Sequence, residues 1–252
     1  MTVLLGLPYS PWSEKARWAL DIRRVPYTSR LYQPLVGEPA LRQKLRRFTG
    51  PVTVPVLTTD DGRVIGDSAE IARWADQSGD GPRLFPTEHE GAIARFVALS
   101  ERALAAGRAL SLERMLGDEE ALREMVPRPL RRALGPLSAR VGSLGIRRTL
   151  RKYDSRANNA AAHRLTLSAA LEEIRSSLAR APGAGPRPLL GSFTFADVAA
   201  AQALAFVEPP ATGLKLKPSS RRCFRDPELR DRYADLIAWR DGLYAAFRVQ
   251  KA

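Results

Sequence analysis

Every segment with the pattern of a β-strand lies within the first 66 residues of this 252-residue chain. Residues 3–7, 27–31, 54–58 and 63–65 are rich in apolar and β-branched side chains, and the last two flank the turn sequence TDDG, which is typical of a β-hairpin. Helical periodicity fills the gaps over residues 10–24, 38–48 and 67–75. The resulting order, β-α-β-α-β-β-α, predicts a small α/β domain over residues 1–78.

After a Gly/Pro-containing linker at residues 79–86, only helical patterns remain. We expect helices over 87–116, 156–180, 194–206 and 227–247, and an all-α domain spanning 87–252. In the second of these helices, one apolar face is expected from Leu165, Leu167, Leu171, Ile174 and Leu178. Prolines and glycines interrupt residues 117–152, which predicts a broken connection or short helices.

Positive charge is concentrated in the second part of the chain, whose overall net charge is +13. Only three acidic side chains lie in residues 119–152, against these basic ones: Arg123, Arg128, Arg131, Arg132, Arg140, Arg147, Arg148, Arg151 and Lys152. Such a basic insertion either forms a solvated face or attracts nucleic acid, an anionic membrane or acidic substrates.

Cysteine content and hydropathy exclude several classes of protein. The single cysteine, Cys223, excludes a disulfide framework and a multi-cysteine metal site, so we expect no metal. The first residues lack the basic and apolar regions of a signal peptide, and no apolar stretch reaches 18 residues. We therefore expect a cytoplasmic protein.

The segment YSPWSEKARWAL, residues 9–20, combines a helix start with a candidate reactive group. Ser10 has the position of an N-cap and Pro11 that of the first helical residue, a favoured pair. The same hydroxyl, at the positive end of a helix, is able to donate a hydrogen bond to an anion. The local pattern alone favours a capped helix, and the rest of the chain has to decide whether Ser10 also serves chemistry.

Three further motifs have a local physical meaning. Pro55 in VPVL lies where a strand begins, and a cis bond costs least before proline. Asp67 and Ser68 open a helix whose free N–H groups favour an anion. Thr194 and Asp197 have the spacing of a capping box, which we interpret as structural.

These motifs, in this order and in this architecture, resemble those of the cytosolic glutathione S-transferase family. The matching segments are SPWSEKARWAL, VPVL, DSAEIARWA and GSFTFADVAAAQAL. The resemblance covers most of the chain and is weakest over residues 117–152. It implies a thioredoxin-like α/β N-terminal domain, an all-α C-terminal domain, a homodimer, and glutathione as co-substrate in detoxification chemistry.

The resemblance also implies roles for particular residues. Ser10 stabilises the glutathione thiolate, while the other expected glutathione contacts are Trp12, Val54, Pro55 with a cis bond, Asp67 and Ser68. Tyr9 is the alternative thiol donor, and Ser13 a supplementary one. The family's usual lysine or glutamine before the cis-proline is replaced here by Thr53, which leaves Arg42 or Lys44 as substitutes for binding the glycyl carboxylate.

The sequence leaves the second substrate open. A small hydrophobic electrophile is expected, in a pocket lined by Leu112, Met115, Leu116 and Tyr153, although core packing is the simpler interpretation of each alone. Isomerase, lyase and dehalogenase reactions also occur on this scaffold. The alternative function is a non-catalytic binding module whose basic helical domain holds an anionic partner.

Overall fold

The computed structural model describes residues 1–34, 37–153, 159–181 and 187–248. Its first part has the expected order β-α-β-α-β-β-α, made of β1 (Val3–Gly6), α1 (Pro11–Ile22), β2 (Thr28–Leu31), α2 (Glu38–Leu45), β3 (Val56–Thr58), β4 (Val64–Ile65) and α3 (Ser68–Ser78). The α/β domain is thus confirmed.

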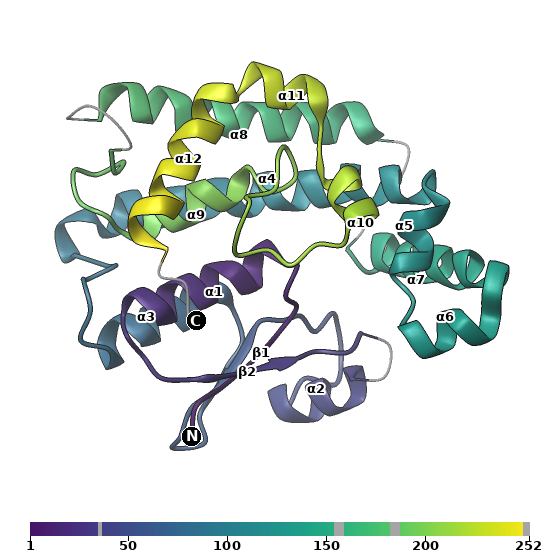
Figure 1. Cartoon of the computed structure of the whole chain (residues 1–252). Coiled ribbons are helices and arrows are strands. Elements are labelled where there is room, and N and C mark those ends of the chain that lie inside the picture. Colours follow the sequence, from purple (N-terminus) through teal and green to yellow (C-terminus); the bar gives the residue numbers. More distant parts are fainter. Residues whose placement is uncertain (35–36, 154–158, 182–186, 249–252) are drawn as a thin grey trace.

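The four strands form one mixed sheet in the order β2-β1-β3-β4. Strand β1 runs parallel to β2 and antiparallel to β3, and β3 and β4 form the antiparallel hairpin predicted at TDDG. Helix α2 lies on the opposite side of the sheet from α1, which faces the helices of the second part (Figure 1).

Among the described residues after 78, all regular elements are helices, as predicted. They are η1 (Thr87–His89), α4 (Glu90–Leu116), α5 (Glu119–Glu124), α6 (Arg128–Leu134), η2 (Gly135–Leu137), α7 (Ser138–Lys152), α8 (Ala160–Arg180), α9 (Phe195–Ala203), α10 (Pro218–Phe224), α11 (Pro227–Arg232) and α12 (Ala234–Phe247).

One apolar core joins the two parts of the chain. It contains Trp18 and Ala19 of α1 and Ala72 of α3, together with buried side chains of α4, α8, α9 and α12. Helix α9 is buried along its whole length and begins with the predicted capping box of Thr194 and Asp197. The first-turn end of α1 is therefore held between the sheet and the helical layer (Figure 1).

Several expectations about the helices were wrong in detail. Leu165 is 72% exposed, so it lies outside the buried face formed by Leu167, Leu171 and Ile174. The helix predicted over 227–247 is two helices, because Tyr233 leaves helical geometry (φ −114°, ψ 29°) and its buried hydroxyl donates to the Ser168 carbonyl. Helix α10 was not predicted. Residues 156–158, at the start of another predicted helix, and 182–186, in a predicted loop, lie outside the described residues.

Residues 117–152 form short helices followed by one of 15 residues, α7. Gly142 does not interrupt α7. The glycine lets this helix approach α5 closely, since a Cβ there would lie 2.1 Å from the Leu122 carbonyl oxygen.

Candidate functional site

The strand register brings three of the predicted motifs to one end of the sheet. Leu5 near the end of β1 pairs with Val56 at the start of β3, and Leu57 pairs with Ile65 at the end of β4. The segments that follow β1, precede β3 and follow β4 therefore lie at the same edge. These segments carry Ser10, Val54–Pro55 and Asp67–Ser68.

Ser10 is the N-cap of α1, in extended geometry (φ −88°, ψ 126°), and Pro11 is the first helical residue. The Ser13 N–H donates to Ser10 Oγ over 3.4 Å, and the Glu14 N–H donates to the Ser10 carbonyl. The side chain is 9% exposed. Because Oγ accepts in this contact, its own proton stays available to a ligand anion at the helix N-terminus.

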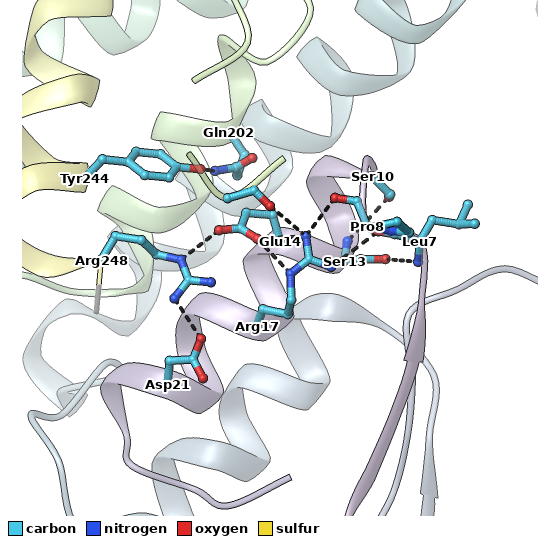
Figure 2. Close-up of polar contacts among 11 residues, drawn as sticks. Leu7, Pro8, Ser10, Ser13, Glu14, Arg17, Asp21, Gln202, Tyr244 and Arg248 are labelled. Carbon is cyan, nitrogen blue, oxygen red and sulfur yellow. Dashed lines mark hydrogen bonds and ion pairs between the residues drawn. The ribbon is translucent and has the colours of Figure 1, made fainter. Parts of the chain in front are cut away.

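An ion network behind this turn fixes its backbone (Figure 2). Arg17 donates from Nη1 to the Leu7 carbonyl (3.3 Å) and from Nη2 to the Pro8 carbonyl (3.3 Å), the two residues that lead into the turn. Its Nε–H donates to the buried Glu14 carboxylate (2.8 Å). The network therefore ties the approach to Ser10 to the body of α1.

Arg248, beyond the end of α12, continues the same network through Glu14 and along α1 to Asp21 (Figure 2). Its guanidinium lies 2.7 Å from Glu14 Oε1 and 2.7 Å from Asp21 Oδ2, and all three side chains are at most 10% exposed. Burial lowers the pKa of Arg248, but the two carboxylates outweigh it, so the pKa is raised and the group stays charged.

The neighbouring hydroxyl groups differ from Ser10. Ser13 is fully buried, and its Oγ accepts from the Leu7 N–H (3.1 Å), so it supports the turn from within. Tyr9, the alternative donor, is partly buried, and burial raises the pKa of its phenol to about 12. That shift makes Tyr9 a weaker hydrogen-bond donor to a thiolate than an ordinary tyrosine.

The peptide bond between Val54 and Pro55 is cis, as predicted. Pro55 is buried, and Val54 is half-buried directly before β3. Val54 lies outside the paired residues of β3, which begin at Val56, so an extended ligand is able to pair with the Val54 backbone.

Helix α3 begins at the third motif. Asp67 is its exposed N-cap and accepts from the Ala69 N–H (2.7 Å) and Glu70 N–H (3.3 Å). Ser68 is 1% exposed, and its Oγ has no hydrogen-bond partner among the described residues. A buried hydroxyl without a partner at a helix N-terminus suits a ligand carboxylate.

Trp12 faces the helical layer, and most of the residues expected around the electrophile pack near it. Trp12, Leu112 and Leu116 pack, partly buried, against one apolar cluster. Met115 is a buried member of that cluster, at 3% exposure, so it packs behind the other side chains. Arg108 of α4 contacts both Tyr153 and Trp12. Its guanidinium carbon lies 4.9 Å from the Trp12 ring centroid and 3.6 Å from that of Tyr153.

A basic groove lies between α2 and α7. It has a volume of about 450 Å³ and is lined by Glu38, Arg42, Gly50, Pro51, Arg148, Arg151 and Lys152. Lys152 Nζ donates to the Val52 carbonyl over 2.6 Å, two residues before Val54. Lys44 donates instead to Thr58 Oγ1 (2.8 Å) and does not line the groove. Of the two candidates for a glycyl carboxylate, Arg42 is thus the one at the groove.

Within the described ranges, no three His, Cys, Asp or Glu side chains are grouped so that they could hold a metal ion. None of the described helices has the length and apolar character needed to cross a membrane.

The comparison with known proteins finds matches for the first part of the chain. The sequence profile of the glutathione S-transferase N-terminal domain matches residues 9–78. Probable glutathione S-transferases of Solanum tuberosum and Nicotiana tabacum are 35% and 34% identical over 98 residues, or 38% of this chain. The first part of this chain is thus similar to glutathione S-transferases. The matched region spans about two fifths of those relatives, 42% and 41% of their length.

Solved structures of glutathione S-transferases resemble the whole of this chain in fold. A glutathione S-transferase of Methylobacillus flagellatus with glutathione bound is 18% identical, with a TM-score of 0.64 and 98% of both chains covered. One from Methylobacterium radiotolerans, in complex with glutathione sulfonate, is 20% identical, with a TM-score of 0.62 and coverage of 100% of this chain and 97% of the other. These likenesses show that the fold extends across both parts of the chain.

Sequence reasoning missed several residues at this site. Arg108 is the only charged side chain in the segment ALAAGRALSL, residues 103–112, and a lone charge in an apolar helix was the available signal. Glu101, which accepts from Trp12 Nε1–H (2.7 Å) and pairs with the buried Lys15, had no such signal.

Proposed function

We propose that this protein is a glutathione transferase in which the Ser10 hydroxyl stabilises the glutathione thiolate. The observation that carries the proposal is the arrangement of Ser10 Oγ: it accepts from the Ser13 N–H at the start of α1, and its proton is free to donate. A donor and the positive end of a helix lower the pKa of a nearby thiol. The thiolate then attacks an electrophilic carbon, a C–S bond forms, and the leaving group departs with the electron pair.

The other parts of glutathione fit the remaining motifs at the sheet edge. The cysteinyl backbone pairs with the exposed N–H and C=O of Val54, as an added strand would. The γ-glutamyl carboxylate takes the unpartnered Ser68 hydroxyl and the α3 N-terminus, and its ammonium group takes Asp67. The glutathione bound to the family structures supports this assignment of the ligand.

The glycyl carboxylate is placed in the basic groove. The groove begins at Pro51, three residues before Val54, and Arg42 and Lys152 supply cations there. Glu38 pairs with Arg42 and Arg148, which orients both guanidinium groups without cancelling the positive charge of the groove.

The acceptor is a small electrophile bound between α1 and α4, where Trp12, Leu112, Leu116 and Tyr153 come together and Met115 packs behind them. Conjugation is the reaction that these residues support directly. The matches with probable transferases do not favour the alternative of a non-catalytic module for an anionic partner. A homodimer is expected from the family and is checked by analytical ultracentrifugation.

The test is conjugation of 1-chloro-2,4-dinitrobenzene to glutathione, with retention on immobilised glutathione measured beside it. Ser10→Ala is expected to lower kcat/KM by about 10- to 100-fold, the cost of a hydrogen bond to a charged group. Ser29→Ala, on the exposed strand β2, is the matched control and should behave as the wild type. A wild type that is neither retained nor active contradicts the proposal.

A further inference from the structure

Arg108 is a partly buried cation that has no hydrogen-bonding partner among the described residues. Its guanidinium lies between the rings of Trp12 and Tyr153, and its Nε is buried with no acceptor among the described residues. Buried polar groups are nearly always satisfied, so each exception needs an explanation. The unsatisfied Arg108 Nε lies at the site between α1 and α4, where the electrophile is proposed to bind.

Arg114, six residues further along the same helix, shows how such a group is satisfied when its role is structural. Its Nε–H donates to the Cys223 carbonyl (2.8 Å), and Nη1 lies 3.3 Å from the Asp226 carboxylate. Burial lowers the pKa of both arginines, yet of the two only Arg114 has hydrogen-bond acceptors among the described residues. The contrast indicates that Arg108 is not a structural ion-pair partner.

Glu101, about two helical turns before Arg108 on α4, attracts the Arg108 guanidinium electrostatically but is already engaged by other donors. Glu101 accepts from the Trp12 indole through Oε2 and from Lys15 through Oε1, and no ion pair joins it to Arg108 in the part of the chain that the structure describes. Lys152 lies near the Tyr153 ring (5.7 Å to its centroid) and adds a second cation nearby. The local potential at Arg108 therefore favours an anion.

The surroundings of this cation are aromatic and apolar. Trp12 and Tyr153 lie on its two sides, and Leu112 follows one helical turn later on α4. A planar guanidinium held in this way presents its remaining N–H groups in a fork that matches a carboxylate or sulfonate. An aromatic ring carrying such a group would pack against the apolar side chains and accept hydrogen bonds from the guanidinium.

We propose that Arg108 binds an anionic group on the acceptor substrate, so that the transferase favours aromatic electrophiles that carry a carboxylate or sulfonate. This inference rests on the proposed function, since it assigns the second substrate of that reaction. Glutathione itself carries carboxylates, but the tripeptide is held by Val54, Ser68 and the α2–α7 groove in our assignment.

The test compares a charged and an uncharged acceptor, 4-chloro-3,5-dinitrobenzoate and its methyl ester. Because the ester is the more reactive electrophile, each kcat/KM is divided by the rate constant of the uncatalysed reaction with glutathione. For the wild type, this ratio should be higher with the acid. In Arg108→Gln it should fall by about 10- to 100-fold with the acid and by less than about threefold with the ester. KM for glutathione should stay unchanged. A rise in this KM would mean that Arg108 binds a carboxylate of glutathione and not of the acceptor, which would overturn the assignment.

Two variants separate recognition from folding and from net charge. Arg108→Lys keeps the cation and should retain part of the preference for the acid. Arg147→Gln removes an exposed cation of α7 that contacts only Ser143 among the described residues and should leave the preference intact. Equal losses for acid and ester in Arg108→Gln would contradict the inference.

A binding measurement makes the result independent of catalysis. Calorimetry with 3,5-dinitrobenzoate, which has no leaving group, should show binding to the wild type that weakens about 10- to 100-fold in Arg108→Gln and remains in Arg147→Gln. If the protein proves inactive but this difference is found, the anion site stands and the proposed reaction fails. A wild type that binds neither the acid nor its methyl ester overturns the anion site.

Discussion

Ser10 and Ser13 lie one helical turn apart, and the structure gives their hydroxyl groups different tasks. Ser10 Oγ accepts one long contact from the Ser13 N–H, whereas Ser13 Oγ is fully buried and accepts from the Leu7 N–H. A Cβ at Gly6 would lie 2.9 Å from Ser13 Oγ, so this glycine makes room for it. The sequence pattern S-x-x-S alone does not distinguish the two, because capping and burial depend on the strand that precedes the helix.

Ser13→Ala should therefore affect stability rather than chemistry. Removing the hydroxyl leaves the Leu7 N–H buried without its acceptor, which should lower the free energy of unfolding by about 1–3 kcal/mol. Urea denaturation measures this loss, and the absorbance of bound thiolate should titrate as in the wild type. A shift of that titration would instead make Ser13 a second donor, as the sequence had suggested.

Cys223 is a thiol whose environment suppresses its reactivity. It is 4% exposed, and burial together with Asp118 raises the pKa of its thiol from 9.0 to about 11. Because the thiolate is the nucleophile, a rise of two units lowers the reactive fraction at pH 8 by about 100-fold. Alkylation by iodoacetamide should thus be slow at pH 8 and accelerate about tenfold per pH unit up to about pH 11.

The unfolded chain is the control for this prediction. In guanidinium chloride, Cys223 should react as an ordinary cysteine, and its rate should level off near pH 9. Rapid alkylation of the native protein at pH 8 contradicts the account of this site.

At the scale of elements, the predicted features are those fixed by local sequence. The TDDG hairpin, the caps at Ser10, Asp67 and Thr194 and the order of strands and helices follow from turn and capping chemistry within a few residues. Helix α7 and the break at Tyr233 were not predictable in this way. They depend on a close approach to α5 and on a hydroxyl bound to α8, which are contacts between distant parts of the chain.

Two glycines of α7 make this point testable. At Gly142 an added Cβ meets the Leu122 backbone, so Gly142→Ala should lower the free energy of unfolding by about 1–3 kcal/mol. At Gly145 nothing lies within 4 Å of the added Cβ, so Gly145→Ala should raise it by about 0.5–1 kcal/mol through helix propensity. Chemical denaturation of both variants checks the pair, and equal effects of the two substitutions would show that α7 does not pack on α5 as described.

The candidate site shows the same division between local and long-range information. Ser10, Val54, Asp67 and Ser68 were found because they belong to short motifs that register brings to one sheet edge. Arg108 and Lys152 reach the site from helices about 100 residues away in sequence, and no local pattern specifies which helix faces α1. Arg17 and Arg248 were missed for a related reason, since their roles are to fix backbone and helix positions.

At the scale of the whole molecule, the end of α12 is anchored to the helix that carries Ser10. Arg248→Gln should leave the fully buried Glu14 with only Arg17 as a charged partner, and we expect a loss of about 2–4 kcal/mol in the free energy of unfolding. The exposed pair of Arg95 and Glu173 provides the control, because Arg95→Gln should cost at most about 1 kcal/mol. Thermal and urea unfolding measure both variants.

A second measurement on the same network separates anchoring from general destabilisation. In a double-mutant cycle, Arg248→Gln and Glu14→Gln should show a coupling energy of about 1–3 kcal/mol, since the two groups are in direct contact. Additive effects would mean that the C-terminal end and α1 are stabilised independently.

The central claim is that Ser10 holds glutathione as a thiolate, and the most direct test is the thiol pKa of bound glutathione. Ultraviolet absorbance of the thiolate, titrated with saturating glutathione, measures it in the wild type and in Ser10→Ala. We expect the wild type to lower the pKa clearly below the ordinary thiol value of about 8.5, and Ser10→Ala to raise it again by about 1–2 units. Superimposable titrations of the two proteins, with glutathione bound to both, would contradict the account.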